Sequence, residues 1–77
     1  MEKTIQFKLF ASLKKFTPSD SDNFSIFPDE TVEGVLKALS IPINEVKLVF
    51  INGIRREINT VLRNGDRVGI FPPVGGG

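Results

Sequence analysis

Only one stretch of the sequence has the apolar spacing of an amphipathic helix, and this constrains the fold more than any other feature. Thr31 precedes the stretch and is the predicted N-cap, because its hydroxyl can accept a hydrogen bond from an unpaired backbone N–H. Pro42 is predicted to end the helix. The apolar stripe, spaced i, i+3, i+4 and i+7, consists of Val32, Val35, Leu36 and Leu39.

The other apolar residues mostly alternate with polar ones, and a period of two predicts strands. The clearest predicted strand covers residues 4–10, with Ile5, Phe7 and Leu9 on one side. It is followed by a predicted helical turn at 11–16 and a polar loop at 17–23. Asn-Gly at 52–53 and Asn-Gly-Asp at 64–66 predict turns. Further strands are predicted at 24–26, 47–51, 54–58 and 67–71.

The predicted order is strand, strand, helix, strand, short strand, strand. One helix can cover only one face of the sheet, so the 77 residues predict a two-layer α+β domain with a single core. This order is typical of the β-grasp, or ubiquitin-like, roll, a mixed sheet with one main helix whose first and last strands lie side by side and parallel. The predicted β-grasp domain covers residues 1–71, and residues 72–77 form a flexible Gly-Gly C-terminal tail of the same domain.

The composition excludes many kinds of chemistry. The sequence has no Cys and no His, which removes thiolate nucleophiles, imidazole bases and the Cys ligands of a plant-type ferredoxin. We therefore expect no metal or cofactor on this chain. Its ten basic and nine acidic residues are mixed along the sequence, so we expect neither nucleic acid nor membrane as a partner. The first residues lack the pattern of a signal peptide, and a cytoplasmic protein is expected.

The C-terminal end is the most unusual chemical feature. Gly75, Gly76 and Gly77 carry no Cβ, so this backbone is slender enough to thread a narrow channel. Pro72 and Pro73 directly precede Val74 and these glycines. Each proline holds φ at about −65°, which gives a stiff exit from the last strand. The combination predicts a main-chain carboxylate delivered into another protein's active site. The alternative is a frayed end behind two strand-terminating prolines.

Residues 69–77, Gly-Ile-Phe-Pro-Pro-Val-Gly-Gly-Gly, follow the turn sequence Asn-Gly-Asp-Arg-Val. Together they resemble the small subunit of molybdopterin synthase, the MoaD branch of the MoaD/ThiS sulfur carriers. Residues 7–13 are similar to the family's first strand, and residues 31–39 to its helix, so the resemblance spans nearly the whole chain. The Phe-Pro-Pro ending is its most specific part. Gly75 departs from the pattern, since Ala or Ser is expected before the final Gly-Gly.

The resemblance implies a mechanism of sulfur transfer. An E1-like, MoeB-like adenylating enzyme would use ATP to activate the carboxylate of Gly77, and a sulfur-donor protein would convert it to a thiocarboxylate. The tail would then enter the large subunit of molybdopterin synthase and donate sulfur to cyclic pyranopterin monophosphate, forming the dithiolene of molybdopterin. The chain would thus be a non-catalytic sulfur-donor subunit in molybdenum cofactor biosynthesis, with ATP used by its partner.

The resemblance also implies roles for particular residues. Gly77 would bear the sulfur. The other threading residues would be Gly75, Gly76, Pro72, Pro73 and Val74. The predicted partner surface on the outer sheet face consists of the exposed apolar pair Phe10 and Phe71, with Arg55, Arg56 and Lys14 at its rim. Alternatively, the two phenylalanines pack on each other and the three cations are ordinary solvated surface charges.

Three other functions remain open. A ThiS-like carrier for the thiazole of thiamine would share the tail chemistry, although it usually lacks Phe-Pro-Pro and is shorter between its first strands. In a ubiquitin-like modifier, a substrate lysine would attack the activated carbonyl of Gly77. A plain β-grasp interaction domain would make no use of its tail, and removal of Gly77 would leave its partner function intact.

Overall fold

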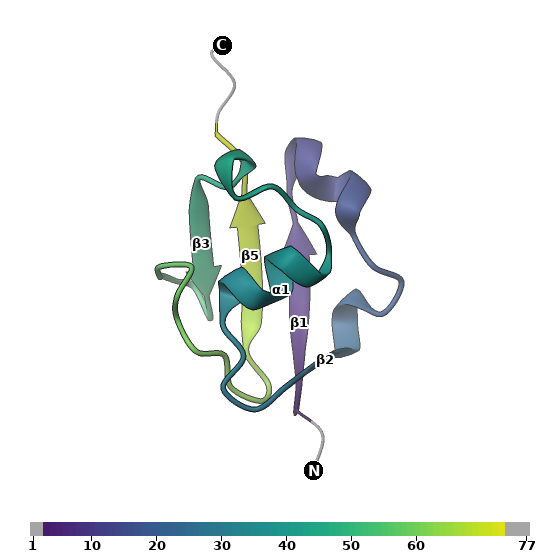
Figure 1. Ribbon diagram of the computed structural model, residues 1–77, viewed down its shortest axis with the longest axis vertical. Helices are drawn as coiled ribbons and strands as arrows, with labels where there is room; N and C mark the ends of the chain where they lie inside the picture. The colour runs from purple at the N-terminus through teal and green to yellow at the C-terminus, as the bar shows by residue number, and fades with distance from the viewer. Residues whose placement is uncertain (1–2, 74–77) are drawn as a thin grey trace.

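The computed structural model describes residues 3–73, which form a five-stranded sheet with one α-helix packed across one face (Figure 1). Short 3-10 helices occupy Ala11–Phe16, Ser21–Asn23 and Ile43–Glu45. The strands are β1 (Lys3–Leu9), β2 (Phe24–Ile26), β3 (Leu48–Ile51), β4 (Ile54–Arg55) and β5 (Arg67–Phe71), and the helix is α1 (Val32–Ala38).

The first and last strands lie side by side at the centre of the sheet. The strand order is β2-β1-β5-β3-β4, with β1 and β5 parallel and every other neighbouring pair antiparallel. Phe7 lies opposite Val68 in the parallel pair, and Leu9 lies opposite Ile70. This arrangement confirms the ubiquitin-like β-grasp fold that the order of elements predicts.

The apolar core lies between the sheet and α1. The inward residues of β1 alternate with exposed polar ones, as the period-two pattern predicts. The helical stripe covers them, although Leu39, the residue after the helix, is only partly buried. The core consists of Ile5, Phe7, Leu9, Leu13, Ile26, Val32, Val35, Leu36, Ile41, Val49, Ile51, Leu62, Val68 and Ile70. Among the described residues, none of the buried side chains is polar or charged.

The start of α1 follows the sequence prediction. Thr31 precedes the helix with an extended backbone, and its side-chain Oγ1 accepts a hydrogen bond from the N–H of Gly34 at 3.1 Å. This bond satisfies one of the backbone donors that the first turn leaves unpaired.

The end of α1 differs from the prediction. The helix stops at Ala38, well before Pro42, so the proline is not what ends it. Ser40 takes a left-handed backbone with φ of 60°. Its N–H donates to the carbonyl of Lys37, and the next N–H, of Ile41, donates to the carbonyl of Leu36. This pair of bonds is a Schellman motif, which closes a helix without a proline.

The returning strand β4 is also shorter than predicted, covering Ile54–Arg55 instead of residues 54–58. The chain leaves the sheet at this point to meet the start of α1. The N–H of Glu33 donates to the carbonyl of Ile58 at 2.8 Å, and the N–H of Val32 donates to the carbonyl of Thr60 at 3.1 Å. Two unpaired donors of the first helical turn are thereby satisfied, which a longer strand would prevent.

Both predicted turns are present, and a side-chain network joins them. Asn52 and Gly53 have φ of 54° and 83°, as a two-residue hairpin turn requires. The side-chain amide of Asn52 donates to Asp66 Oδ1 at 2.9 Å, and its oxygen accepts from the N–H of Arg67 at 3.0 Å. Asn64 Oδ1 accepts from the N–H of Thr4 at 2.9 Å. These bonds fix the point at which β5 begins.

The left-handed backbone at Ser40 predicts how substitutions at this position change the stability of the protein. Ser40→Gly is expected to raise the free energy of unfolding by about 0.5–1 kcal/mol, because glycine adopts positive φ without a steric penalty. Ser40→Val is the matched control and is expected to lower it, since a β-branched residue fits this conformation poorly. Urea unfolding of the three proteins measures both effects. A destabilised glycine variant would contradict the assignment of the helix end.

Candidate functional site

The described part of the tail is its base. β5 ends at Phe71, and Pro72 and Pro73 continue past the sheet at one end of the molecule (Figure 1). Val74, Gly75, Gly76 and Gly77 lie outside the described residues, and so does the predicted flexibility of the tail. The described part of the site consists of β5 and the surfaces beside the proline pair.

Hydrogen bonds hold the last residues of β5 on both sides. The N–H of Phe10, just past β1, donates to the carbonyl of Ile70 at 3.1 Å. On the other side, the N–H of Lys47 donates to the carbonyl of Phe71 at 2.8 Å. Because these bonds reach the residue before Pro72, the sheet fixes the direction in which the proline pair starts.

A hollow of about 490 Å³ lies at the base of the proline pair. Pro72 is half-buried against it, while Pro73 is exposed. The lining of the hollow is mostly apolar and includes Ala11, Ser12, Lys47, Leu48, Phe71, Pro72 and Pro73. The prolines thus contact the fold before the chain continues toward the glycines.

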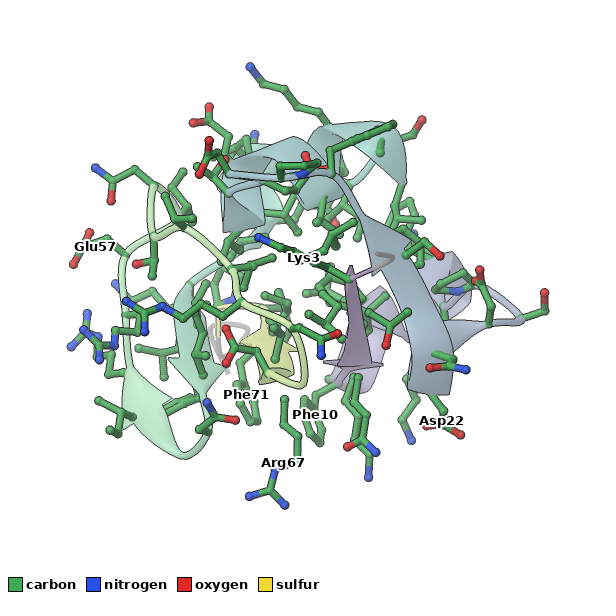
Figure 2. The ribbon with its side chains drawn as sticks, turned by 90° about the horizontal axis from the view of Figure 1, so that it is seen from below. Lys3, Phe10, Asp22, Glu57, Arg67 and Phe71 are labelled. Carbon is green, nitrogen blue, oxygen red and sulfur yellow. The ribbon has the colours of Figure 1, made fainter. Side chains whose placement is uncertain are left out.

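Three aromatic rings, of Phe10, Phe50 and Phe71, form what we call the aromatic cluster on the sheet face opposite α1. The rings of Phe10 and Phe71 are parallel to within 1°, with centroids 4.3 Å apart. Phe50 meets Phe71 edge-on at 5.6 Å. Figure 2 shows Phe10 and Phe71 side by side on this face.

The cluster agrees with the predicted face but not with the predicted exposure. Phe10 and Phe71 are half-buried rather than exposed, because each ring covers one face of the other. Sequence reasoning missed Phe50. Its position in the alternating pattern of β3, between buried Val49 and Ile51, places it on the opposite side of the sheet and could have identified it.

Gly69 forms the floor beside the aromatic cluster. It is paired with Lys8 on β1 and with Phe50 on β3. A Cβ at this position would lie 3.3 Å from a ring carbon of Phe10, closer than such contacts normally are. The absence of a side chain therefore leaves room for the ring, and a second hollow of about 490 Å³ opens over the strand.

The three cations predicted for the partner surface lie in different places. Arg55 pairs with Phe50 across the hairpin and so shares its face. Arg56 lines a separate hollow of about 330 Å³ with exposed Ile54 and Val61. Lys14 is exposed on the 3-10 helix Ala11–Phe16. The fold thus brings only Arg55 to the face of the aromatic cluster.

Metal binding and membrane crossing are two further possibilities for residues 3–73. No group of three or more His, Cys, Asp or Glu side chains in this part of the chain is placed to hold a metal ion. Nor does any helix within the same range combine the length and apolar character needed to cross a membrane.

Two solved structures from Haloferax volcanii are similar along nearly the whole chain. The solution structure of the HVO 2177 protein is 29% identical, with a TM-score of 0.74, covering 99% of this chain and 88% of that one. The crystal structure of SAMP1 is 25% identical, with a TM-score of 0.67, covering 96% of this chain and 99% of that one. No curated protein matches the sequence.

The match to a family of sequences is equally extensive. Residues 2–75 match the family described as Mut7-C ubiquitin. Together with the two structures, this match supports a ubiquitin-like β-grasp of the MoaD type, without singling out the molybdopterin synthase subunit. Because the match reaches from the first strand into the glycine tail, the chain belongs to the Mut7-C ubiquitin family.

Proposed function

We propose that this chain is a ubiquitin-like sulfur carrier whose Gly77 carboxylate is activated and then converted to a thiocarboxylate. The observation that carries the proposal is the construction of β5. It is hydrogen-bonded on both sides as far as Phe71 and leads directly into Pro72 and Pro73, ahead of three terminal glycines. From this rigid base, the main-chain carboxylate of Gly77 would reach a partner on a narrow backbone.

The chemistry follows from what the sequence lacks. With no Cys, the chain can carry sulfur covalently only on a carbonyl carbon. A carboxylate oxygen is a poor leaving group, so an E1-like enzyme would first join Gly77 to AMP from ATP and release pyrophosphate. Hydrosulfide supplied by a sulfur-donor protein would then attack the acyl carbon and displace AMP, and loss of the S–H proton would give the thiocarboxylate. The partners supply ATP and the catalytic groups.

The proposed destination of the sulfur is molybdopterin. The Phe-Pro-Pro sequence at 71–73 and the glycines beyond it support this assignment through their likeness to the small subunit of molybdopterin synthase. The tail would enter the large subunit and donate sulfur to cyclic pyranopterin monophosphate. This work would take place in the cytoplasm. A ThiS-like role in thiamine synthesis would use the same thiocarboxylate with another acceptor.

A second candidate function is protein modification. It is favoured by the family description, ubiquitin, and by the similarity to SAMP1 over 96% of this chain. The activation step would be the same. A lysine amine of a target protein would then attack the acyl carbon of Gly77, giving an isopeptide bond in place of a thiocarboxylate.

The tail chemistry is tested by intact-mass spectrometry. Incubation of the chain with ATP, an adenylating enzyme and a sulfur donor is expected to add the mass difference of one oxygen replaced by sulfur. Deletion of Gly77 leaves a Gly-Gly end one residue short and tests the reach of the tail. Gly76→Val keeps the length and tests the width of the channel. Both variants are expected to lose most of the product, and unchanged yields would contradict threading.

The acceptor is tested in cells that lack this chain. These cells are expected to lose molybdoenzyme activity. The full-length chain is expected to restore it, and the Gly77 deletion is not. A thiamine requirement instead would assign the ThiS-like role. Proteomic recovery of target lysines linked to Gly77, with molybdoenzyme activity intact, would establish the modifier and overturn the proposed sulfur route.

A further inference from the structure

The charged side chains that surround the aromatic cluster on the sheet face opposite α1 are cations. The acidic side chain of Asp22 lines a separate hollow of about 250 Å³ together with Gln6 and Arg67. Alternation along the strands places Lys8 and Arg67 on this face, and pairing with Phe50 adds Arg55. All three cations are exposed, and Figure 2 shows Arg67 projecting on the side of Phe10 and Phe71. The hollow over Gly69 is lined by Gln6, Lys8, Phe10, Phe50, Gly53, Arg67, Val68, Gly69 and Phe71, none of which is acidic.

The chain does not neutralise these cations within residues 3–73. The ion pair in that part of the chain joins Lys37 to Glu33 on α1, at 3.6 Å and on the other side of the sheet. The face therefore combines an apolar floor and wall with a rim of positive charge that has no carboxylate within 4 Å among the described residues. A complementary surface would be apolar at its centre and negative at its edge.

We propose that the hollow over Gly69 receives an apolar side chain from a protein partner whose flanking residues are acidic. The apolar side chain would lie against the aromatic cluster, and its neighbouring carboxylates would pair with Lys8, Arg55 and Arg67. The proposal deepens the proposed function and rests on it in one respect, namely that this partner is a protein that handles the tail. Phe71 connects the two regions, because it belongs to the cluster and immediately precedes Pro72.

The geometry disfavours a nucleic acid on the same face. Single-stranded nucleic acids bind by stacking bases on open aromatic faces. Here one face of Phe10 and one face of Phe71 already cover each other at 4.3 Å, and Phe50 meets Phe71 edge-on. What remains open is the hollow beside these rings, whose lining includes Phe50 and Gly69 and which suits a compact aliphatic side chain.

A second copy of the chain is also a poor occupant. In a two-fold symmetric dimer the same patch is present on both sides of the interface. Docking this face on itself would bring Lys8, Arg55 and Arg67 against the same three cations of the other copy. Like charges in contact are unfavourable, so charge complementarity points to a different protein.

The direct test is NMR titration of the isotope-labelled full-length chain with a short blocked peptide that carries one leucine between glutamates. The amides of Lys8, Gly69 and Phe71 are expected to shift, and the shifts should vanish with salt near 1 M, where the Debye length falls to about 3 Å. Matched peptides replace the leucine by glycine or the glutamates by lysines, and both are expected to bind about tenfold more weakly or not at all.

Charge-reversal variants separate this face from the rest of the surface. The double variant Lys8→Glu, Arg67→Glu is expected to weaken peptide binding about tenfold or more. Lys14→Glu with Arg56→Glu makes the same change of net charge away from the hollow and is expected to leave the affinity within about twofold. Equal losses in both would show that net charge alone drives binding and would overturn the proposal.

The remaining outcomes are equally decisive. The absence of shifts on this face, binding of an oligothymidine there in place of the peptide, or concentration-dependent shifts without any ligand would each overturn the proposal. The Gly77 deletion is expected to bind the peptide as the full-length chain does. Peptide binding can therefore be measured even if no thiocarboxylate forms. Conversely, a failure of peptide binding would not contradict the proposed tail chemistry.

Discussion

The parallel pairing of β1 with β5 is the contact on which the other features depend. It joins the two ends of the sequence at the middle of the sheet, with Phe7 opposite Val68 and Leu9 opposite Ile70. Residues facing one way from these strands form the core under α1, and residues facing the other way form the aromatic face. The same pairing carries the chain to Pro72. The stability of the core, the aromatic face and the starting direction of the proline pair thus share one structural origin.

Sequence periodicity predicted the elements well where local preferences decide them. The bounds of β5 and the Thr31 cap were right, because alternation and a hydroxyl N-cap act over a few neighbouring residues. β1 and β3 differ from their predicted ranges by no more than one residue at either end, and the two larger errors depend on distant parts of the chain. Ser40 takes its left-handed backbone where Ile41 turns into the core, and β4 ends early because α1 requires the carbonyls of residues 58 and 60.

The candidate site divides in the same way. Alternation was sufficient to place Phe10 and Phe71 on one face, but not to show that they stack, because stacking depends on the register between strands far apart in sequence. The role of Gly69 in making room for the Phe10 ring also depends on this register, since its neighbours come from β1 and β3. Roles for the tail residues came from the resemblance to the MoaD branch. The Mut7-C ubiquitin match supports the broader assignment to ubiquitin-like proteins.

The parallel pairing of β1 with β5 also determines how the molecule responds to a mechanical force. β1 begins at Lys3 and β5 ends at Phe71, and because the strands are parallel these two points lie at opposite ends of the pair. A force that draws the tail away from the N-terminal end would load the hydrogen bonds between the strands in shear, all at once rather than one by one. A partner could therefore pull on the glycine arm without peeling the last strand from the sheet.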